Sequence, residues 1–252
     1  MQVYFDRLTS MLKGQVSKKK LEEMIPYLGL DLEEIAGEYL RIEYNPNRPD
    51  FATDYGLAKA LNSFLDLETK WSDYKVSKGS IVVKVDKSIQ SIRPYLVGAV
   101  ARNVKIDDES IRQLIALQED LHNGIGRMRR KASIGVHNLD VLKPPFEYLA
   151  VEPSFSFVPL NETKGMSMSQ ILSETETGKQ YAHLVNSFSK YPLLRDSAGG
   201  VLSFPPIING DLTKLTASTK NLFIDMTATD LKTAENALAI FITTLADAGA
   251  AI

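Results

Sequence analysis

The sequence predicts a mixed α/β (α+β) fold, with a small N-terminal α+β domain followed by a larger domain in which helices cover a mixed sheet. Segments with alternating apolar residues lie between segments whose apolar residues recur every three or four positions, which indicates strands and amphipathic helices in one chain. Two later strand segments are separated only by the hairpin-like Ser197-Ala-Gly-Gly200, whereas others are separated by helices. With 252 residues, 44% of them hydrophobic, the chain can bury one or two cores.

The first elements are short. Gln2–Phe5 is an apolar stretch, and Asp6–Leu12 favours a helical turn. Ser17 is a suitable N-cap for a helix, and Pro26 keeps that helix short or bends it. The apolar stripe of this helix consists of Leu21, Met24, Ile25 and Leu28.

A strand, a turn and a helix follow. Tyr39–Tyr44 alternates with period two, which predicts a half-buried strand, and the two prolines of Asn45–Asp50 end it. Thr53 or Asp54 then caps a helix. Its predicted inward residues are Leu57, Leu61, Phe64 and Leu65.

The helical periodicity is lost after this helix. Thr69–Gly79 is a polar stretch whose large apolar residues are only Trp71, Tyr74 and Val76. We therefore place a domain boundary there, with residues 1–78 as an N-terminal structural domain and residues 79–252 as a second domain.

The second domain contains longer strands. The predicted strands are Ile81–Val85, Tyr95–Val104, Ala132–Val136, Phe146–Val151, Leu193–Asp196, Val201–Phe204 and Leu222–Thr227. A helix is predicted from Asp107 or Asp108, another over Gly178–Val185, and a last one capped by Thr229 or Asp230. The expected inward residues of the first and last of these helices are Ile111, Leu114, Ile115, Leu117 and Leu121, and Leu231, Ala234, Leu238, Phe241, Ile242 and Leu245. The long connection Ser154–Glu176 has no assigned element.

The last four residues look like the end of a helix and the start of a further element. Gly249 is suited to a helix C-cap, and Gly249-Ala-Ala-Ile252 looks like a helix end followed by the start of another strand. This pattern favours a domain-sized fragment of a longer protein, with a natural ending as the alternative.

Composition excludes several classes of function. The chain has no cysteine, which excludes disulfides, thiol nucleophiles and thiolate metal sites and fits a cytoplasmic location. No apolar run approaches the ~20 residues that a membrane span needs, so we expect no membrane partner. The three histidines, His122, His137 and His183, lack the spacing of metal ligands, so we expect no metal site.

A local cluster of positive charge is the first candidate for binding. The net charge of −2 predicts no global attraction to nucleic acid, and the chain has no phosphate-binding glycine loop or nucleophile elbow. Arg127, Arg129, Arg130 and Lys131 nevertheless place four positive side chains in five positions, which is enough for several phosphate contacts. A solvated loop is the alternative interpretation.

Polar residues near the end of the chain are the second candidate. In Val201–Asn209, two prolines fix a loop that could hold Ser203 and Asn209 at the rim of an apolar cavity, with an edge strand and a rigid turn as the alternative. Asp225 and Thr227 share one face of a hydrophobic strand, where a carboxylate is costly unless it is paired, part of a site, or on an exposed face.

One histidine also follows a predicted strand. His137 comes directly after Ala132–Val136, and we interpret it as a surface or structural hydrogen-bonding residue, with a catalytic base as the alternative.

Several of these motifs, in this order, resemble one known family. They are Asn45-Pro-Asn-Arg-Pro-Asp50, Leu57-Ala-Lys-Ala-Leu61, Ile134-Gly-Val-His-Asn-Leu-Asp140, Lys143-Pro-Pro-Phe146, Phe157-Val-Pro-Leu160, Tyr181-Ala-His-Leu184, Ser203-Phe-Pro-Pro-Ile-Ile-Asn209 and Asn221-Leu-Phe-Ile-Asp225. The sequence resembles the beta subunit of phenylalanyl-tRNA synthetase of the archaeal and eukaryotic type. The likeness spans nearly the whole chain.

The resemblance implies an editing domain that hydrolyses tRNA(Phe) wrongly charged with tyrosine. It implies a pocket with Leu194, Ser203, Asp225 and Thr227. We expect Leu194 and Ser203, with Asn209 of the proline loop, to bind the substrate and Asp225 and Thr227 to be catalytic. The charge density of Arg127, Arg129, Arg130 and Lys131 leads us to expect that this cluster contacts tRNA phosphates. In this family ATP and magnesium serve the alpha subunit, so this segment needs no cofactor, and the whole enzyme is a heterotetramer of two alpha and two beta subunits.

A polar pocket suits the selection of tyrosine against phenylalanine, because a buried partner for the phenol is left unpaired when phenylalanine enters. We expect Asp225 and Thr227, together with the terminal ribose hydroxyls, to orient a water against the ester. Two alternatives are a non-catalytic module for subunit assembly or RNA binding, and an unrelated RNA-binding protein.

Overall fold

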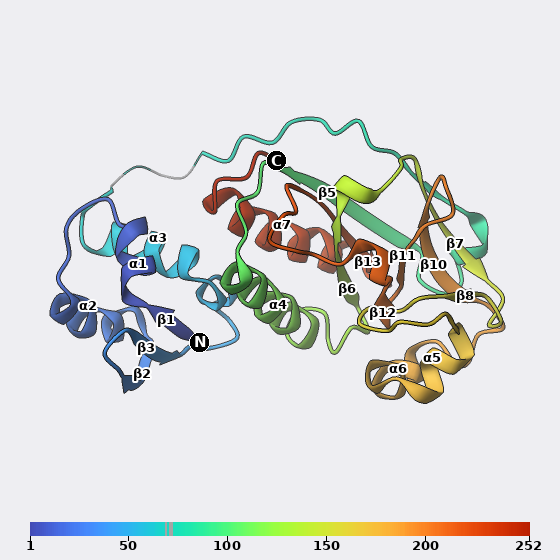
Figure 1. Cartoon of the computed structure of the whole chain (residues 1–252), viewed down its shortest axis with the longest axis horizontal. Coiled ribbons are helices and arrows are strands. Elements are labelled where there is room, and N and C mark those ends of the chain that lie inside the picture. The colour runs from blue at the N-terminus through green and yellow to red at the C-terminus, as the bar shows by residue number, and fades with distance from the viewer. Residues whose placement is uncertain (69, 71–72) are drawn as a thin grey trace.

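The computed structural model describes residues 1–68, 70 and 73–252 (Figure 1). Thr69 and Trp71, two residues of the predicted boundary stretch, lie outside the described residues. The described residues between 65 and 82 contain no helix or strand. They connect an N-terminal unit to a larger second unit, and the division at residue 78 stays a prediction.

The N-terminal unit has a three-stranded antiparallel sheet in the order β1-β3-β2, packed against helices. Its elements are β1 (Gln2–Tyr4), α1 (Phe5–Met11), α2 (Lys18–Met24), β2 (Asp31–Ile35), β3 (Tyr39–Glu43) and α3 (Asp54–Phe64). Ser17 caps α2 by accepting a hydrogen bond from the Lys20 N–H, and a 3₁₀ turn at Ile25–Leu28 replaces the α-helix around Pro26. The caps and the β3 prediction are confirmed.

Two details of this unit differ from expectation. Strand β2 was not predicted, because none of its five residues is buried and its sequence therefore shows no apolar alternation. Phe64, expected to face inward, is the last residue of α3 and is 45% exposed.

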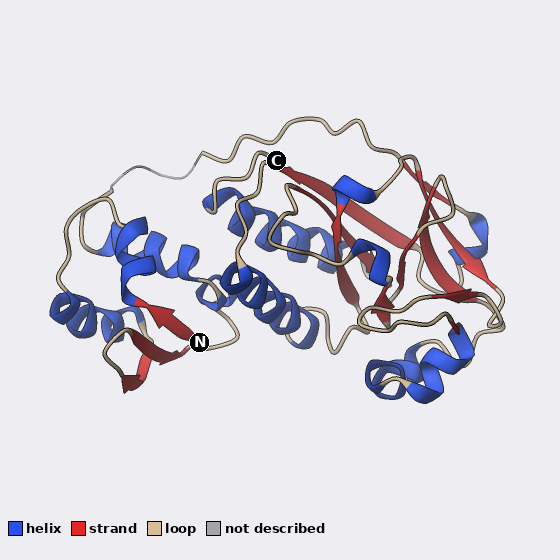
Figure 2. Cartoon of the chain, viewed as in Figure 1, coloured by secondary structure: helices blue, strands red, loops and turns tan. Residues whose placement is uncertain are grey.

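The second unit contains two main sheets and four α-helices among the described residues (Figure 2). Its elements are β4 (Val83–Val85), β5 (Tyr95–Arg102), α4 (Asp108–Asn123), β6 (Ala132–Asn138), β7 (Phe146–Val151), β8 (Ser156–Phe157), β9 (Met166–Ser167), α5 (Met168–Glu174), α6 (Glu176–Tyr181), β10 (Tyr191–Asp196), β11 (Val201–Phe204), β12 (Ile208–Asn209), β13 (Asn221–Ala228) and α7 (Leu231–Asp247).

These sheets form the inner layers of the unit. One sheet has the order β5-β13-β6 and is antiparallel, and the other has the order β12-β11-β10-β7-β4, in which only β4 and β7 are parallel. Helices α4 and α7 pack on one face of the three-stranded sheet, and α5 and α6 pack on the outer side of the five-stranded sheet. Side chains of both sheets meet in a further apolar cluster between them. The predicted mixed fold is confirmed.

Individual predictions in this unit had different outcomes. Asp107 and Asp230 cap α4 and α7 as expected, and β10 and β11 form the predicted hairpin. Helix α5 lies in the connection Ser154–Glu176, to which the sequence analysis assigned no element. A 3₁₀ turn replaces the second half of the helix predicted over Gly178–Val185. Ile115 and Leu231, expected to face inward, are 52% and 41% exposed.

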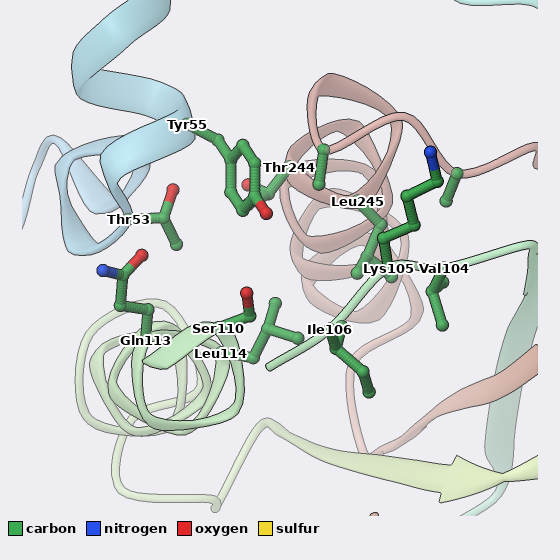
Figure 3. Close-up of a pocket in the computed structure, with 12 residues that line it drawn as sticks. Thr53, Tyr55, Val104, Lys105, Ile106, Ser110, Gln113, Leu114, Thr244 and Leu245 are labelled. Carbon is green, nitrogen blue, oxygen red and sulfur yellow. The ribbon is translucent and has the colours of Figure 1, made fainter. Parts of the chain in front are cut away.

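The two units touch through polar contacts. Arg7 of α1 forms an ion pair with Asp107, the N-cap of α4, as well as with Asp54 of its own unit, and Tyr44 donates a hydrogen bond to Asp120 at 2.5 Å. A small pocket nearby lies between the start of α3, the first turns of α4 and the end of α7 (Figure 3). Its volume of about 10 Å³ holds at most one water, so it is a packing gap and not a ligand site.

None of the helices in the described residues combines the length and the apolar composition that crossing a bilayer requires.

Candidate functional site

The central strand β13 alternates between two buried environments. Ile224 and Met226 belong to the core under α4 and α7. On the opposite face, Phe223 packs into the cluster between the sheets, and Asp225 and Thr227 follow it with period two. Asp225 is 2% exposed and Thr227 is fully buried, so an exposed sheet face does not explain the carboxylate.

A histidine lies beside this carboxylate. His137 Nε2 is 2.8 Å from Asp225 Oδ2, and His137 Nδ1 is 2.8 Å from Thr213 Oγ1. Asp225 pairs across the strands with Gly135 of β6, and His137 lies two residues further along that strand. His137 is within the strand and fully buried, so it is not a surface residue, whereas its two side-chain contacts agree with the interpretation as a structural hydrogen-bonding residue. The hydrogen bond offsets part of the cost of burying Asp225.

Thr227 is engaged by a buried arginine. Arg93 donates from Nε to Thr227 Oγ1 at 2.9 Å and from its guanidinium to Thr227 O at 2.7 Å and Ser133 Oγ at 3.2 Å. Burial lowers the pKa of Arg93 to about 10, while Tyr148 and Asp225 act in the opposite direction. Arg93 therefore stays charged at neutral pH and adds positive charge near Asp225.

A cavity of about 310 Å³ opens beside Asp225, in the size range of small-ligand sites. Ser203 and Asn209 line it together with Asp225. The Oγ of Ser203 is buried and has no hydrogen-bond partner within the described part of the chain. The apolar part of the wall comes from Ile134, Leu160 and the loop over residues 204–208. The cavity thus combines apolar walls with a few polar groups.

Two of the predicted pocket residues lie behind this wall. Leu194 pairs with Ser203 across the hairpin, but its side chain is fully buried in the cluster that contains Phe223. Thr227 does not line the cavity, because its hydroxyl is bonded to Arg93. The structure therefore brings Ser203, Asn209 and Asp225 together at the cavity and places Leu194 and Thr227 behind its wall.

The basic cluster forms an unusual turn. Arg127, Met128 and Arg129 have φ angles of 53°, 54° and 62°, a left-handed conformation that is costly for non-glycine residues. Arg93 donates to the main-chain oxygens of Arg129 at 3.1 Å and Arg130 at 3.3 Å. These bonds help to hold the turn.

The turn sends Arg129 inward. Arg129 is 9% exposed, lines the cavity, and donates to the main-chain oxygens of Pro206 and Ile207 and to Glu119. This contradicts its expected place among four solvent-facing phosphate contacts. Arg127, Arg130 and Lys131 are exposed, although Lys131 lies 3.6 Å from the Asp230 carboxylate.

Known proteins resemble this chain closely. No family model matches it. It is 47% identical over 235 residues to the phenylalanine–tRNA ligase beta subunit of Methanosarcina barkeri. The matched region covers 93% of this chain and 43% of that protein. For the corresponding subunit of Methanosphaera stadtmanae the identity is 40% over 249 residues, with 98% and 44% covered.

A solved structure has the same fold. The crystal structure of an N-terminal fragment of the phenylalanyl-tRNA synthetase beta-subunit from Pyrococcus horikoshii matches with a TM-score of 0.92 and 35% identity, over 100% of this chain and 74% of that chain. The chain belongs to the phenylalanyl-tRNA synthetase beta-subunit family. The family indicated by the sequence motifs is confirmed, and the chain spans less than half the length of the curated synthetase subunits that it matches.

The sequence analysis missed Arg93 and Ser133, which bond Thr227, and undervalued His137, which bonds Asp225. Ser133, Gly135 and His137 alternate, so extending the predicted strand beyond Val136 would have put His137 on the face of Asp225. Arg93 precedes a proline in an irregular segment, and no periodic pattern marks it.

Proposed function

We propose that this chain carries an editing site that hydrolyses the ester bond of tRNA(Phe) wrongly charged with tyrosine. The observation that carries the proposal is the buried, unpartnered Oγ of Ser203 at a cavity that Asp225 also lines. Buried hydroxyls are normally hydrogen-bonded, so one that is not suggests a ligand that completes it. A phenol hydroxyl is such a ligand, and the apolar wall suits its ring.

The same hydroxyl accounts for discrimination. When tyrosine is bound, the phenol and Ser203 Oγ pair with each other. When phenylalanine is bound, Ser203 Oγ stays unpaired, so the tyrosyl substrate is favoured by about 1–3 kcal/mol, or roughly 5- to 150-fold in rate. Correctly charged tRNA is therefore spared.

Asp225 supplies the chemistry. Its carboxylate orients a water whose oxygen bonds to the ester carbonyl carbon while one water proton passes to the carboxylate. The bond between that carbon and the ribose oxygen then breaks, and the ribose oxygen takes the proton. The products are tyrosine and tRNA(Phe) with a free terminal ribose hydroxyl.

The remaining partners are also proposals. Arg127, Arg130 and Lys131 contact tRNA phosphates beside the cavity, to which Arg129 of the same turn belongs. In the whole enzyme, two such beta subunits assemble with two alpha subunits that use ATP and magnesium. Among the described residues, no group of three or more His, Asp or Glu side chains could hold a metal ion.

Deacylation tests the proposal. Tyr-tRNA(Phe) and Phe-tRNA(Phe) are incubated with the wild-type chain, S203A and D225N, and remaining ester is measured over time. We expect rapid loss of the tyrosyl ester only, abolished by D225N, and a smaller preference for tyrosine in S203A. Equal ester loss with and without wild-type protein would favour the non-catalytic assembly or RNA-binding module.

A further inference from the structure

Within the described part of the chain, one side chain, that of His137, bonds the carboxylate of Asp225. Its Oδ2 is 2.8 Å from His137 Nε2, and Asp225 also lines the cavity. His137 is fully buried and does not line the cavity itself. It can therefore act on a bound ligand only through Asp225.

Thr213 holds the other ring nitrogen of His137. The Thr213 hydroxyl lies 2.8 Å from His137 Nδ1 and 3.1 Å from Gly210 O. An ionised carboxylate can only accept hydrogen bonds, so His137 Nε2 donates its hydrogen to Asp225 Oδ2.

Gly135 leaves the room for this pair. A Cβ atom at position 135 would lie 2.2 Å from Asp225 Oδ2 and 2.5 Å from His137 Nε2. Both distances are far below van der Waals contact, so a side chain there and the hydrogen bond exclude each other. The strand therefore needs glycine opposite Asp225 for the pair to form.

We propose that His137, held at its other ring nitrogen by Thr213, is a positioning residue that fixes one carboxylate oxygen of Asp225 so that the other is presented to the water in the cavity. This inference rests on the proposed editing function and adds two residues to its machinery. It assigns no direct contact between His137 and the substrate.

Paired variants separate positioning from simple structural support. The carboxamide of Gln places a donor near the position of Nε2, so H137Q keeps a partner for Asp225 and H137L removes it. T213S keeps the hydroxyl and T213V removes it. For Tyr-tRNA(Phe) hydrolysis we expect kcat to fall about 100-fold in H137L and about 10-fold in T213V, with KM nearly unchanged, and to stay within about 5-fold of wild type in H137Q and T213S.

Two outcomes would overturn the inference. One is wild-type kcat in H137L. The other is an equal loss in H137L and H137Q when thermal melting shows both to be folded. If H137L does not fold, the comparisons of H137Q with wild type and of T213V with T213S decide in its place. A loss in T213S equal to that in T213V would contradict the role of the Thr213 hydroxyl in holding the ring.

A spectroscopic measurement tests the geometry without any activity. The chain has three histidines, so the imidazole nitrogens of the ¹⁵N-labelled wild-type protein can be assigned. We expect a protonated Nε2 in His137 whose resonance moves in D225N. An unprotonated Nε2 would reject the positioning role even if editing is active, whereas inactive wild-type protein with the expected resonance would reject the editing function and keep the pair.

Discussion

The guanidinium of Arg93 donates hydrogen bonds to both the main chain and the side chain of Thr227. It donates to Thr227 O at 2.7 Å and to Thr227 Oγ1 at 2.9 Å, and it also bonds the left-handed turn at Arg129 and Arg130. One buried cation thus links the strand that carries Asp225 to the turn that carries Arg129. It compensates for much of the backbone cost of that turn.

R93K should therefore destabilise the fold. Lysine keeps the charge but cannot reproduce the planar set of donors, so several buried acceptors lose their partner. We expect the free energy of unfolding to fall by about 2–4 kcal/mol in chemical denaturation. R112K, at an exposed arginine of α4 paired with Glu109, should change it by less than about 0.5 kcal/mol. Equal losses in both variants would contradict this role.

The exposed basic residues of the turn and the buried Arg129 should have different effects on tRNA binding. The triple variant R127Q/R130Q/K131Q removes exposed charges, so tRNA affinity should fall and the salt dependence of log K should become shallower by about 2–3. K13Q/K19Q/K20Q removes three exposed lysines of the N-terminal unit and is the matched control. Unchanged tRNA binding in the first variant would refute the phosphate contacts.

R129Q should affect stability more than it affects the salt dependence. Its guanidinium bonds Pro206 O, Ile207 O and Glu119, and these groups lose their partner in the variant. We expect the free energy of unfolding to fall by about 2–4 kcal/mol. If R129Q instead makes the salt dependence of tRNA binding as shallow as in the triple variant and leaves stability unchanged, Arg129 contacts phosphate.

Mild acid should destabilise the protein through His122. Burial lowers the pKa of His122, with Glu119 opposing the shift, and Nε2 accepts a hydrogen bond from the Ile134 N–H at 2.8 Å. Because the unfolded chain binds this proton more readily, stability that is present above pH ~6.5 is lost as the pH falls toward the lower folded pKa, by at most about 1.4 kcal/mol per pH unit.

Melting temperatures at pH 7.5 and 5.5 measure this effect. H122Q keeps an acceptor for the Ile134 N–H but does not titrate, so its loss between the two pH values should be smaller than that of wild type. H183Q, at an exposed histidine, should behave like wild type. A pH dependence in H122Q equal to that of wild type would assign the acid sensitivity to another group.

G135A should damage the site with the addition of a single methyl group. The new Cβ would press on both Asp225 and His137, so we expect hydrolysis to fall at least about 10-fold and the free energy of unfolding to fall by about 1–3 kcal/mol. G37A is the control, since a Cβ there meets nothing within 4 Å. Wild-type hydrolysis in G135A would show that the carboxylate tolerates displacement.

R7M should destabilise the N-terminal unit. Asp54 is 1% exposed in its side chain and pairs with Arg7, so the variant leaves a buried carboxylate without its counterion and costs about 3–5 kcal/mol. R41M removes an exposed pair with Glu34 and should cost less than about 1 kcal/mol. Recovery of stability in R7M/D54N would confirm that the unpaired charge is the cause.

Local patterns predicted much of the fold. The N-caps Ser17, Thr53, Asp107 and Asp230 are where the sequence placed helix starts, and the alternation of Asp225 and Thr227 on β13 was predicted correctly. These features depend on residues a few positions apart. The division into residues 1–78 and 79–252 stays a prediction.

Features that depend on distant contacts were not predictable in this way. Arg129 looked like its charged neighbours, and only the left-handed turn, stabilised by Arg93 from 36 residues away, directs it inward. The partners of His137 come from β13 and from the 3₁₀ turn that contains Thr213, which no spacing within its own strand reveals.

Helix α4 joins Arg7 to the cavity wall. Its N-cap Asp107 pairs with Arg7, and its later turns carry Glu119 and His122 at the cavity, 12 and 15 residues or about 18–23 Å further along the helix. Every residue of that wall lies at position 115 or later, yet the helix that supports it is braced from the other unit. A truncated gene product that starts at residue 79 would keep all the wall residues and lose the brace that orients them.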